Sequence, residues 1–261
     1  MKKMTEEELL YEIEQTIDDA IDDNYPHDWY EDQITRDILK GLRKRVGAIT
    51  NIEGRSNWTN RHMSWSAYKQ IGAHETRWGD IAVLVNIVFK DGTRVEGVGF
   101  AEAKKRSIGR SSFDAIRKKQ LQTIARNAPI AQLLLYDYEP STAAEGKIDP
   151  TYFIDYPFEI LRGAKLVYNS RAICTPLATA LASNVKTRDQ MQNSVPFSWE
   201  LVYRYLRGFD LHHHRNVIAA IHGTVESKNL PKFLLAVTVR YDGDTPSGID
   251  LNPNTWEIIE D

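Results

Sequence analysis

Two apolar runs joined by an Asp-Gly pair constrain this chain more than any other feature. The first run, Ile81–Phe89, is rich in β-branched residues and too short between breakers to form a convincing helix. A second run follows Asp91-Gly92, the residue pair that hairpin loops favour. The pattern predicts a β-hairpin flanked by Trp78-Gly79-Asp80 on one side and Glu102-Ala103-Lys104 on the other.

The length of the hairpin loop decides which side chains share a face. A two-residue loop would turn Asp80 and Glu102 to opposite faces of the sheet. A three-residue loop, Lys90-Asp91-Gly92 with Gly92 in the left-handed conformation, would set Asp80 directly opposite Glu102. Because a slip of one residue moves every side chain to the other face, only one of these registers builds a site.

Packing favours the three-residue loop, because that register separates apolar from charged side chains. One face then carries Ile81, Val83, Val85, Ile87 and Val95, with small residues at Gly97, Gly99 and Ala101 that leave room for a helix. The other face carries Asp80, Glu102 and Lys104 at one end, and Asn86, Arg94 and Glu96 near the tip. Two carboxylates that can hold a hard cation, with one ammonium beside them, predict metal-dependent phosphodiester hydrolysis.

These residues resemble the core motif of the PD-(D/E)xK nucleases, the restriction-endonuclease-like superfamily, with no subfamily identified. The resemblance rests on Gly79-Asp80, the apolar strand and Glu102-Ala103-Lys104. It implies an α/β fold in which a helix, three antiparallel strands, a second helix and a further strand build a mixed sheet. One departure is Gly79, which stands where the name-giving proline of the family would be. A simpler interpretation is that Glu102 and Lys104 form a solvated pair on a helix, but Gly97 and Gly99 disfavour a helix there.

The flanking sequence fits this order of elements. Trp29–Arg45 predicts a helix, with apolar residues spaced four apart, Ser112–Arg126 predicts a second, and Ala131–Tyr136 predicts a buried strand. The chain is therefore divided into an acidic amphipathic helix (1–28), a nuclease core (29–138) and a C-terminal α/β extension packed on that core (139–261).

The resemblance also implies roles for individual residues. Asp80, Glu102 and the backbone carbonyl of Ala103 would bind Mg²⁺, for which Mn²⁺ may substitute. Lys104 would orient or deprotonate the attacking water and steady the charge on the phosphorane. Because Mg²⁺ keeps several waters, two carboxylates are sufficient.

Three further residues are candidates for the same site. Glu31 on the first helix is the best candidate for an additional acid, with Asp32 or a plain exposed helix face as the alternatives. Glu75, on the presumed first strand, is a candidate metal ligand. Gln120 on the second helix resembles a glutamine that some subfamilies place beside the scissile phosphate. The alternative is that Gln120 is simply a solvated polar residue of the helix.

Charge is distributed unevenly along the chain. Residues 1–31 hold eleven acids against Lys2 and Lys3, which gives this segment a charge of −9. Since the whole chain has a net charge of −3, the remaining residues carry +6. The acidic segment has an apolar stripe, so it is either a docked amphipathic helix or an acidic cover that competes with DNA. Basic residues that follow the Glu-x-Lys motif are predicted to bind DNA phosphates: Lys105, Arg106, Arg110, Arg117, Lys118 and Lys119.

Composition excludes several other classes of protein. No apolar stretch approaches membrane-spanning length, the first residues do not form a secretory signal, and the single cysteine, Cys174, fits a reducing compartment. We therefore expect a cytoplasmic protein without membrane contact. The predicted function is Mg²⁺-dependent DNA endonuclease activity in a prokaryotic defence or restriction system, acting as a homodimer or with a partner protein. The alternative is a non-catalytic nucleic-acid-binding or assembly subunit with a nuclease-like fold.

Overall fold

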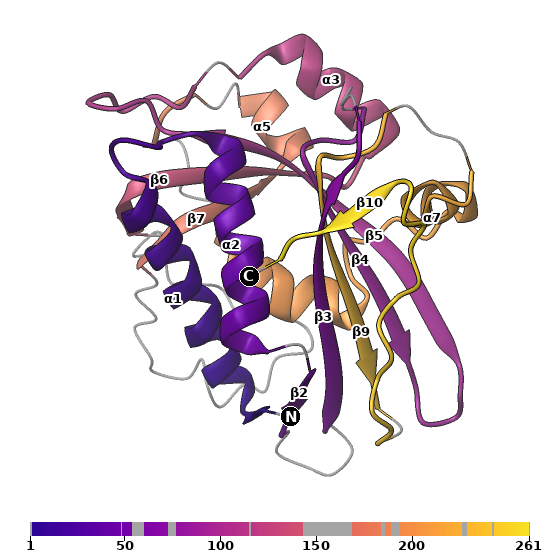
Figure 1. Ribbon diagram of the computed structural model, residues 1–261. Coiled ribbons are helices and arrows are strands. Elements are labelled where there is room, and N and C mark those ends of the chain that lie inside the picture. Colours follow the sequence, from indigo (N-terminus) through magenta and orange to yellow (C-terminus); the bar gives the residue numbers. More distant parts are fainter. Residues whose placement is uncertain are drawn as a thin grey trace.

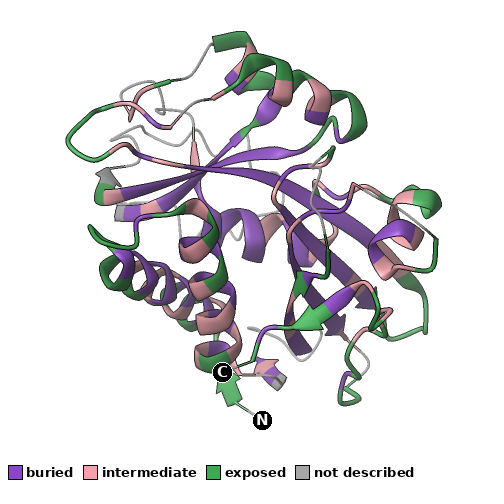
Figure 2. Ribbon diagram, turned by 45° about the horizontal axis from the view of Figure 1, so that its top comes forward, coloured by how far each residue is buried: buried purple, intermediate pink, exposed green. Residues whose placement is uncertain are grey.

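A computed structural model of the chain describes residues 2–47, 49–53, 60–72, 77–114, 116–142, 169–183, 186–188, 194–225, 229–241 and 243–260. It has an α/β fold in which one mixed sheet carries helices on both faces (Figure 1). The strands in the middle of the sheet are buried, whereas the outward sides of the helices are exposed (Figure 2). The α/β class and the mixed sheet predicted from the sequence are therefore confirmed.

The sheet has ten strands among the described residues, in the order β1-β2-β3-β9-β4-β5-β6-β7-β8, with β10 paired to β3. Their bounds are β1 Lys2–Met4, β2 Ile49–Ile52, β3 Arg61–Gln70, β4 Ile81–Val88, β5 Arg94–Lys105, β6 Gln132–Thr142, β7 Asn169–Pro176, β8 Val195–Pro196, β9 Phe233–Arg240 and β10 Trp256–Ile258. The β5–β6, β4–β9 and β1–β2 pairs are parallel, and the other neighbours are antiparallel.

The β4–β5 hairpin has the register of the three-residue loop. Ile81 pairs with Ala101, so that Asp80 and Glu102 come next on the two strands. At the loop, the amide of Phe89 donates to the carbonyl of Thr93 at 2.9 Å. Gly92 has a φ of 81°. Because the left-handed conformation is open to glycine at no steric cost, this residue fixes the loop length and with it the face of every side chain in the hairpin.

Two hydrophobic cores cover the two faces of the sheet. Ile81, Val83, Val85 and Ile87 belong to the core beneath α1 Glu6–Asn24, α2 Glu31–Val46, α6 Phe197–Trp199 and the short π and 3-10 turns η3 Glu200–Arg204 and η4 Tyr205–Arg207. Ala82, Leu84, Val98 and Phe100 belong to the core beneath α3 Lys118–Asn127, α5 Leu177–Ser183 and α7 Arg215–His222. The face that holds the charged end of the hairpin is thus apolar along its middle. The space predicted above Gly99 is filled by the ring of Tyr205.

The C-terminal part of the chain, predicted as an extension packed on the core, contributes strands to the central sheet. Strand β9 lies between β3 and β4, antiparallel to the first and parallel to the second. The three strands β3, β4 and β5 alternate in direction as expected, but the first two are not neighbours. The apolar strand Phe233–Arg240 is buried along almost its whole length, which only a place inside the sheet provides.

Helix α3 begins later than the sequence predicts. Ser112 and Phe113 were expected in its first turn, but they form isolated bridges with Thr187 and Arg106 instead. The amide of Phe113 also donates to the carbonyl of Lys186 at 3.0 Å. Pairing with a segment distant in sequence satisfies these backbone groups, so the local preference for a helix is overridden until Lys118.

The acidic helix α1 is docked through its apolar stripe. Thr5 and Glu8 form a capping box at its start. The stripe is buried in full and consists of Leu9, Leu10, Ile13, Ile17 and Ile21. Acids on the other sides of the helix pair with arginines elsewhere, for example Glu6 with Arg61 and Arg207. This arrangement favours a docked structural element over a loosely held cover.

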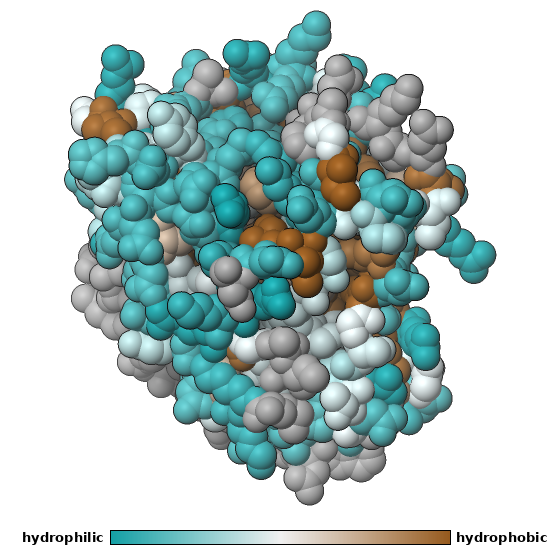
Figure 3. Space-filling view, in the orientation of Figure 1, coloured by the Kyte–Doolittle hydropathy of each residue, from teal (hydrophilic) through white to brown (hydrophobic). Residues whose placement is uncertain are grey.

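The surface seen from the side of Figure 1 is mostly hydrophilic, with hydrophobic residues in small separate groups (Figure 3). Across the described ranges, no helix has both the length and the apolar character needed to cross a membrane.

Candidate active site

Asp80 is placed by an unusual turn just before β4. Its amide donates to the carbonyl of Ala101 at 2.9 Å, and one of its carboxylate oxygens accepts from the amide of Ala103 at 3.0 Å. The preceding Gly79 has a φ of 98°, and a Cβ atom there would lie 2.6 Å from the Ala101 carbonyl oxygen. A positive φ and this close approach both require a residue without a side chain, which explains the glycine at this position.

Glu102 and Lys104 alternate along β5 and share the face on which α3 packs. The sequence predicted an open hairpin end, but both side chains are buried: Glu102 is 0 % exposed and Lys104 is 7 % exposed. Buried charges persist only when they are paired and hydrogen-bonded, so the two residues must be considered with their surroundings.

Four oxygen atoms surround the Lys104 ammonium. Nζ lies 2.7 Å from Glu102 Oε1 and 3.9 Å from Asp80 Oδ2. It donates to the carbonyl of Ala103 at 2.5 Å and lies 3.4 Å from Glu31 Oε2. The residues that the resemblance implies as metal ligands, with Glu31 as the additional acid, therefore converge on one point of the structure.

Two helices supply the outer members of this group. Glu31 lies in the first turn of α2, and its second carboxylate oxygen accepts from the amide of Lys105 at 3.3 Å. Gln120 lies in the first turn of α3 and donates from Nε2 to Glu102 Oε1 at 2.7 Å. Both candidates are thus brought to the site, whereas Asp32 turns to Lys232.

Burial and mutual charge set the protonation of the group. Burial raises the pKa of Glu102, the Asp80 charge raises it further, and Lys104 acts against both. Burial also raises the pKa of Glu31, with Lys104 again opposing the shift. For Lys104 burial alone would lower the pKa, but the charges of Glu102, Asp80 and Glu31 outweigh it and raise the pKa. The lysine is therefore held as a cation, and two of the acids beside it, Glu102 and Glu31, ionise less readily than usual.

The donor set fits a hard divalent cation. Within the described part of the chain, Glu102 Oε2 is buried and has no hydrogen-bond partner, which leaves a carboxylate oxygen free for coordination. No three His, Cys, Asp or Glu side chains of the described residues form a ready metal-binding group. The candidate ligands are instead two carboxylates, Asp80 and Glu102, and one carbonyl, and Mg²⁺ completes such a set with water.

Glu75 lies outside the described residues. The strand on which it was expected, β3, ends at Gln70. Its proposed place among the metal ligands therefore has no structural description.

The predicted DNA-binding cations fall into two groups. Arg110, Arg117, Lys118 and Lys119 are exposed, the last three where α3 begins. By contrast, Lys105 pairs with Asp114 at 2.7 Å. Grouping Arg106 with the surface cations was wrong, because this side chain is 9 % exposed and pairs with Asp137 and Glu139 at 2.9 and 2.7 Å.

The sequence analysis did not identify the partners of Arg106. Asp137 is 1 % exposed and directly follows the apolar run of β6. A carboxylate at the end of a buried strand is a usable signal, because such a side chain needs a partner. Arg188, which pairs with the same two acids, lies in an irregular segment that gives no such signal.

Comparison of the chain with protein-family models, with curated proteins and with solved structures gave no match. The site must therefore be interpreted from its own geometry.

Proposed function

We propose that this protein is a metal-dependent DNA endonuclease with a restriction-endonuclease-like core of the PD-(D/E)xK type. The observation that supports the proposal most strongly is the convergence of Asp80, Glu102, the Ala103 carbonyl and Glu31 around the Lys104 ammonium. The two carboxylates of the motif, Asp80 and Glu102, lie 3.9 and 2.7 Å from the Lys104 ammonium, on a strand pair whose register the loop fixes.

The order of elements around the site also supports the proposal. Helix α2, strands β3, β4 and β5, helix α3 and strand β6 come in the order that the resemblance implies, with the short strand β2 added between α2 and β3. The inserted strand β9 is an elaboration of that plan, since it joins β3 to β4 without disturbing the β4–β5 hairpin or the parallel β5–β6 pair.

Asp80, Glu102 and the carbonyl of Ala103 would hold Mg²⁺, or Mn²⁺ in its place. When bound, such an ion polarises the phosphate and makes a bound water more acidic. Gln120 keeps Glu102 in position through its hydrogen bond to Oε1, which leaves Oε2 free. Glu31 stays next to Lys104 and limits the positions of the ammonium.

Lys104 is the residue that we assign to the attacking water and to the charge that develops on the phosphorane. Its raised pKa keeps it protonated in the resting protein, so its first role is to donate hydrogen bonds to phosphate oxygens. Its flexible four-carbon stem allows the ammonium to follow the phosphate as the reaction proceeds.

By analogy with small nucleases of this kind, we assign the enzyme to a prokaryotic defence or restriction system. In that setting it would cut DNA either as a homodimer or together with a partner protein. The second candidate function is a nucleic-acid-binding or assembly subunit without activity. The complete set of Asp80, Glu102 and Lys104 favours the enzyme.

A cleavage assay tests the proposal. Purified protein is incubated with plasmid DNA, and separately with RNA, in Mg²⁺ or Mn²⁺, with and without EDTA and with added cell extract as a source of partners. We expect cutting of DNA that EDTA stops, and a loss of roughly 100-fold or more in Asp80→Asn and Glu102→Gln. Asp91→Asn, at the exposed tip of the same hairpin, is the matched control and should cut normally.

Direct titration with Mn²⁺ separates the two candidate functions. The enzyme should bind Mn²⁺, and Asp80→Asn should not. DNA binding without Mn²⁺ binding would favour the assembly subunit, and full cutting by Asp80→Asn would refute the metal assignment.

A further inference from the structure

The chain forms a small hairpin immediately after the candidate site. Arg106 and Phe113 form an antiparallel bridge, and the amide of Ser107 donates to the carbonyl of Ser112 at 3.0 Å. The turn between them closes with Gly109 at a φ of 71°. This segment, residues 107–112, is called the site hairpin below; it begins three residues after Lys104.

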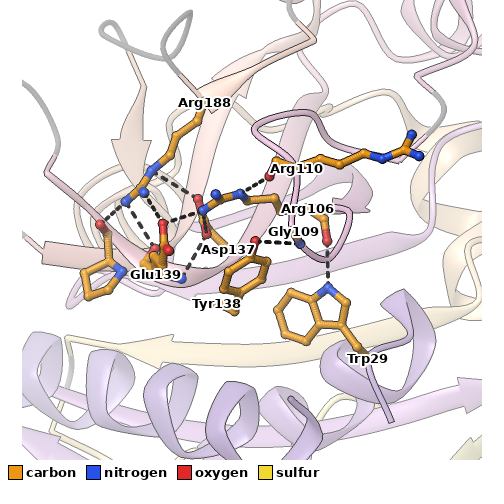
Figure 4. Close-up of polar contacts among 9 residues, drawn as sticks. Trp29, Arg106, Gly109, Arg110, Asp137, Tyr138, Glu139 and Arg188 are labelled. Atoms are coloured by element: carbon orange, nitrogen blue, oxygen red, sulfur yellow. Dashed lines mark hydrogen bonds and ion pairs between the residues drawn. The ribbon is translucent and has the colours of Figure 1, made fainter. Parts of the chain in front are cut away.

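A network of ion pairs, centred on the buried Arg106 and Asp137, holds the site hairpin in place (Figure 4). Arg106 donates from Nε to the carbonyl of Arg110 at 2.6 Å, while its Nη1 reaches Asp137 and Glu139. From the other side, Arg188 pairs with the same two acids at 3.2 and 2.7 Å. The two arginines therefore share two carboxylates, and Arg106 uses its remaining donor to fix the turn.

Aromatic residues fix the same turn from below. The amide of Gly109 donates to the hydroxyl of Tyr138 at 3.1 Å, and the Arg106 guanidinium lies 4.5 Å from the centre of the Tyr138 ring. The Trp29 indole donates to the carbonyl of Arg106 at 2.7 Å. Since Glu31 follows two residues after Trp29, this contact couples the site hairpin to the helix that carries a site acid.

The network neutralises its own charges, and the side chains that the hairpin presents to solvent are different ones. Ile108 is 51 % exposed at the turn. Arg110 is exposed as well, and its side chain extends away from the network (Figure 4). A rigid turn that presents one branched apolar side chain and one guanidinium next to a phosphodiester site has the chemistry of a nucleic-acid contact, since arginine binds phosphate and an apolar wedge packs in a groove.

We infer that the site hairpin holds duplex DNA beside the catalytic group, with Arg110 on a phosphate and Ile108 in the groove. This inference rests on the proposed function. Three more exposed cations follow Arg110 within ten residues, at the start of α3: Arg117, Lys118 and Lys119. Their positive charge adds to that of Arg110 and complements the polyanionic DNA backbone. Arg106 has a positioning role only.

Binding of a labelled DNA duplex in EDTA, followed by fluorescence anisotropy, tests the inference independently of catalysis. We expect Arg110→Gln combined with Ile108→Ser to weaken binding about tenfold, and Arg110→Gln alone to reduce the slope of log K against log salt by about one. Arg94→Gln is the matched control, because Arg94 is an exposed arginine at the other end of the same strand, β5. It should change neither value.

A second measurement separates this inference from the proposed function. Hydrolysis of bis(p-nitrophenyl) phosphate, a small diester with no neighbouring phosphates, should be the same in the site-hairpin variant as in the wild type. The same assay on Asp80→Asn tests only the proposed function, which expects this variant to lose hydrolysis of the small diester. The inference is overturned if wild-type protein does not bind the duplex, if the double variant binds it equally well, or if Arg94→Gln weakens binding as much.

Discussion

Two sets of carboxylates in this protein are fully or partly withdrawn from solvent, but different groups surround them. The first is the candidate active site, with Asp80, Glu102 and Glu31. The second, which we call the core acid pair, consists of Glu14 on α1 and Glu200 on η3, both near the buried thiol of Cys174. Burial is the largest cause of a raised pKa in Glu102 and Glu31 of the first set and in both acids of the second.

The two sets differ in what faces the carboxylates. The candidate site has the Lys104 ammonium at its centre. In the core acid pair, Glu14 accepts from the hydroxyl of Ser198, and Glu200 accepts from the Gln132 amide at 3.4 Å. The nearby Arg204 turns to Asp210 instead, with contacts of 2.7 and 2.9 Å.

This difference decides whether a buried acid can work on charged ligands. Burial raises the pKa of Glu14 to about 7 and that of Glu200 to about 8, so near neutral pH a large share of these carboxyls is protonated and packs without a charge. At the candidate site burial raises the pKa of Glu102 to about 8 as well, but the Lys104 ammonium lies 2.7 Å from its carboxylate and can pair with the charge once it forms. The candidate site is therefore distinguished from the core acid pair by this neighbouring ammonium and not by a lower pKa.

The largest expected effect comes from removing that ammonium. Lys104→Met leaves three acids facing one another without a cation, and we expect a loss of about 3 kcal/mol in the free energy of unfolding at pH 8. Urea denaturation measures it, with the exposed Lys118→Met as the control that should change little. Unchanged stability in Lys104→Met would mean that the lysine does not control the ionisation of these acids.

Replacing an acid of the core acid pair by an amide should raise the free energy of unfolding at pH 8.5, whereas Lys104→Met should lower it at pH 8. The folded protein keeps protons on Glu14 up to about pH 7 and on Glu200 up to about pH 8, whereas glutamate in the unfolded chain loses them near 4.5. The folded state thus binds more protons in this window, and stability falls as pH rises from 4.5 to 8.

Glu14→Gln and Glu200→Gln each remove one acid's share of that fall. Each variant should be about as stable as the wild type at pH 4, and more stable by about 2 kcal/mol at pH 8.5. Denaturation midpoints measured across this range give the result, and the exposed Glu257→Gln serves as the control. A wild-type pH slope in both core variants would show that these carboxyls are ionised despite their burial.

The smallest effect is expected at the residue between the two sets. Tyr136 of β6 is buried and shares a hydrogen bond of 2.9 Å with the Thr35 hydroxyl on α2. Burial raises its pKa, and Cys174, Asp80 and Glu31 add to the shift, so the ring faces both regions. Tyr136→Phe should lower stability by about 1 kcal/mol and leave DNA cutting within a few-fold. A loss of cutting as large as that in Glu102→Gln would mean that the hydroxyl takes part in the site.

The local parts of the fold were predictable because they depend on neighbours in sequence. The Asp91-Gly92 turn and the alternation of apolar residues fixed the register of the hairpin, and Gly92 has the positive φ that the three-residue loop requires. Spacing of four residues predicted α2, which begins at Glu31 and brings that acid to Lys104. Each of these results follows from a period and a turn alone.

The errors all involve partners distant in sequence. Helix α3 starts at Lys118 because the preceding residues pair with the segment around Lys186 and Thr187. Arg106 does not serve as a surface cation for DNA, because it pairs with Asp137 and Glu139 of β6. No sequence period records such pairings.

The sequence by itself determined which residues could form a site: a turn, a register and three charged side chains on one face of a hairpin. The tertiary structure decided that Glu102 and Lys104 are buried, that Glu31 and Gln120 join them from two helices, and that β9 enters the middle of the sheet. The physical reason is that the two kinds of interaction act over different distances along the chain. Backbone preferences and side-chain periodicity act over a few residues, whereas desolvation and ion pairing depend on which distant segments exclude water from the same place.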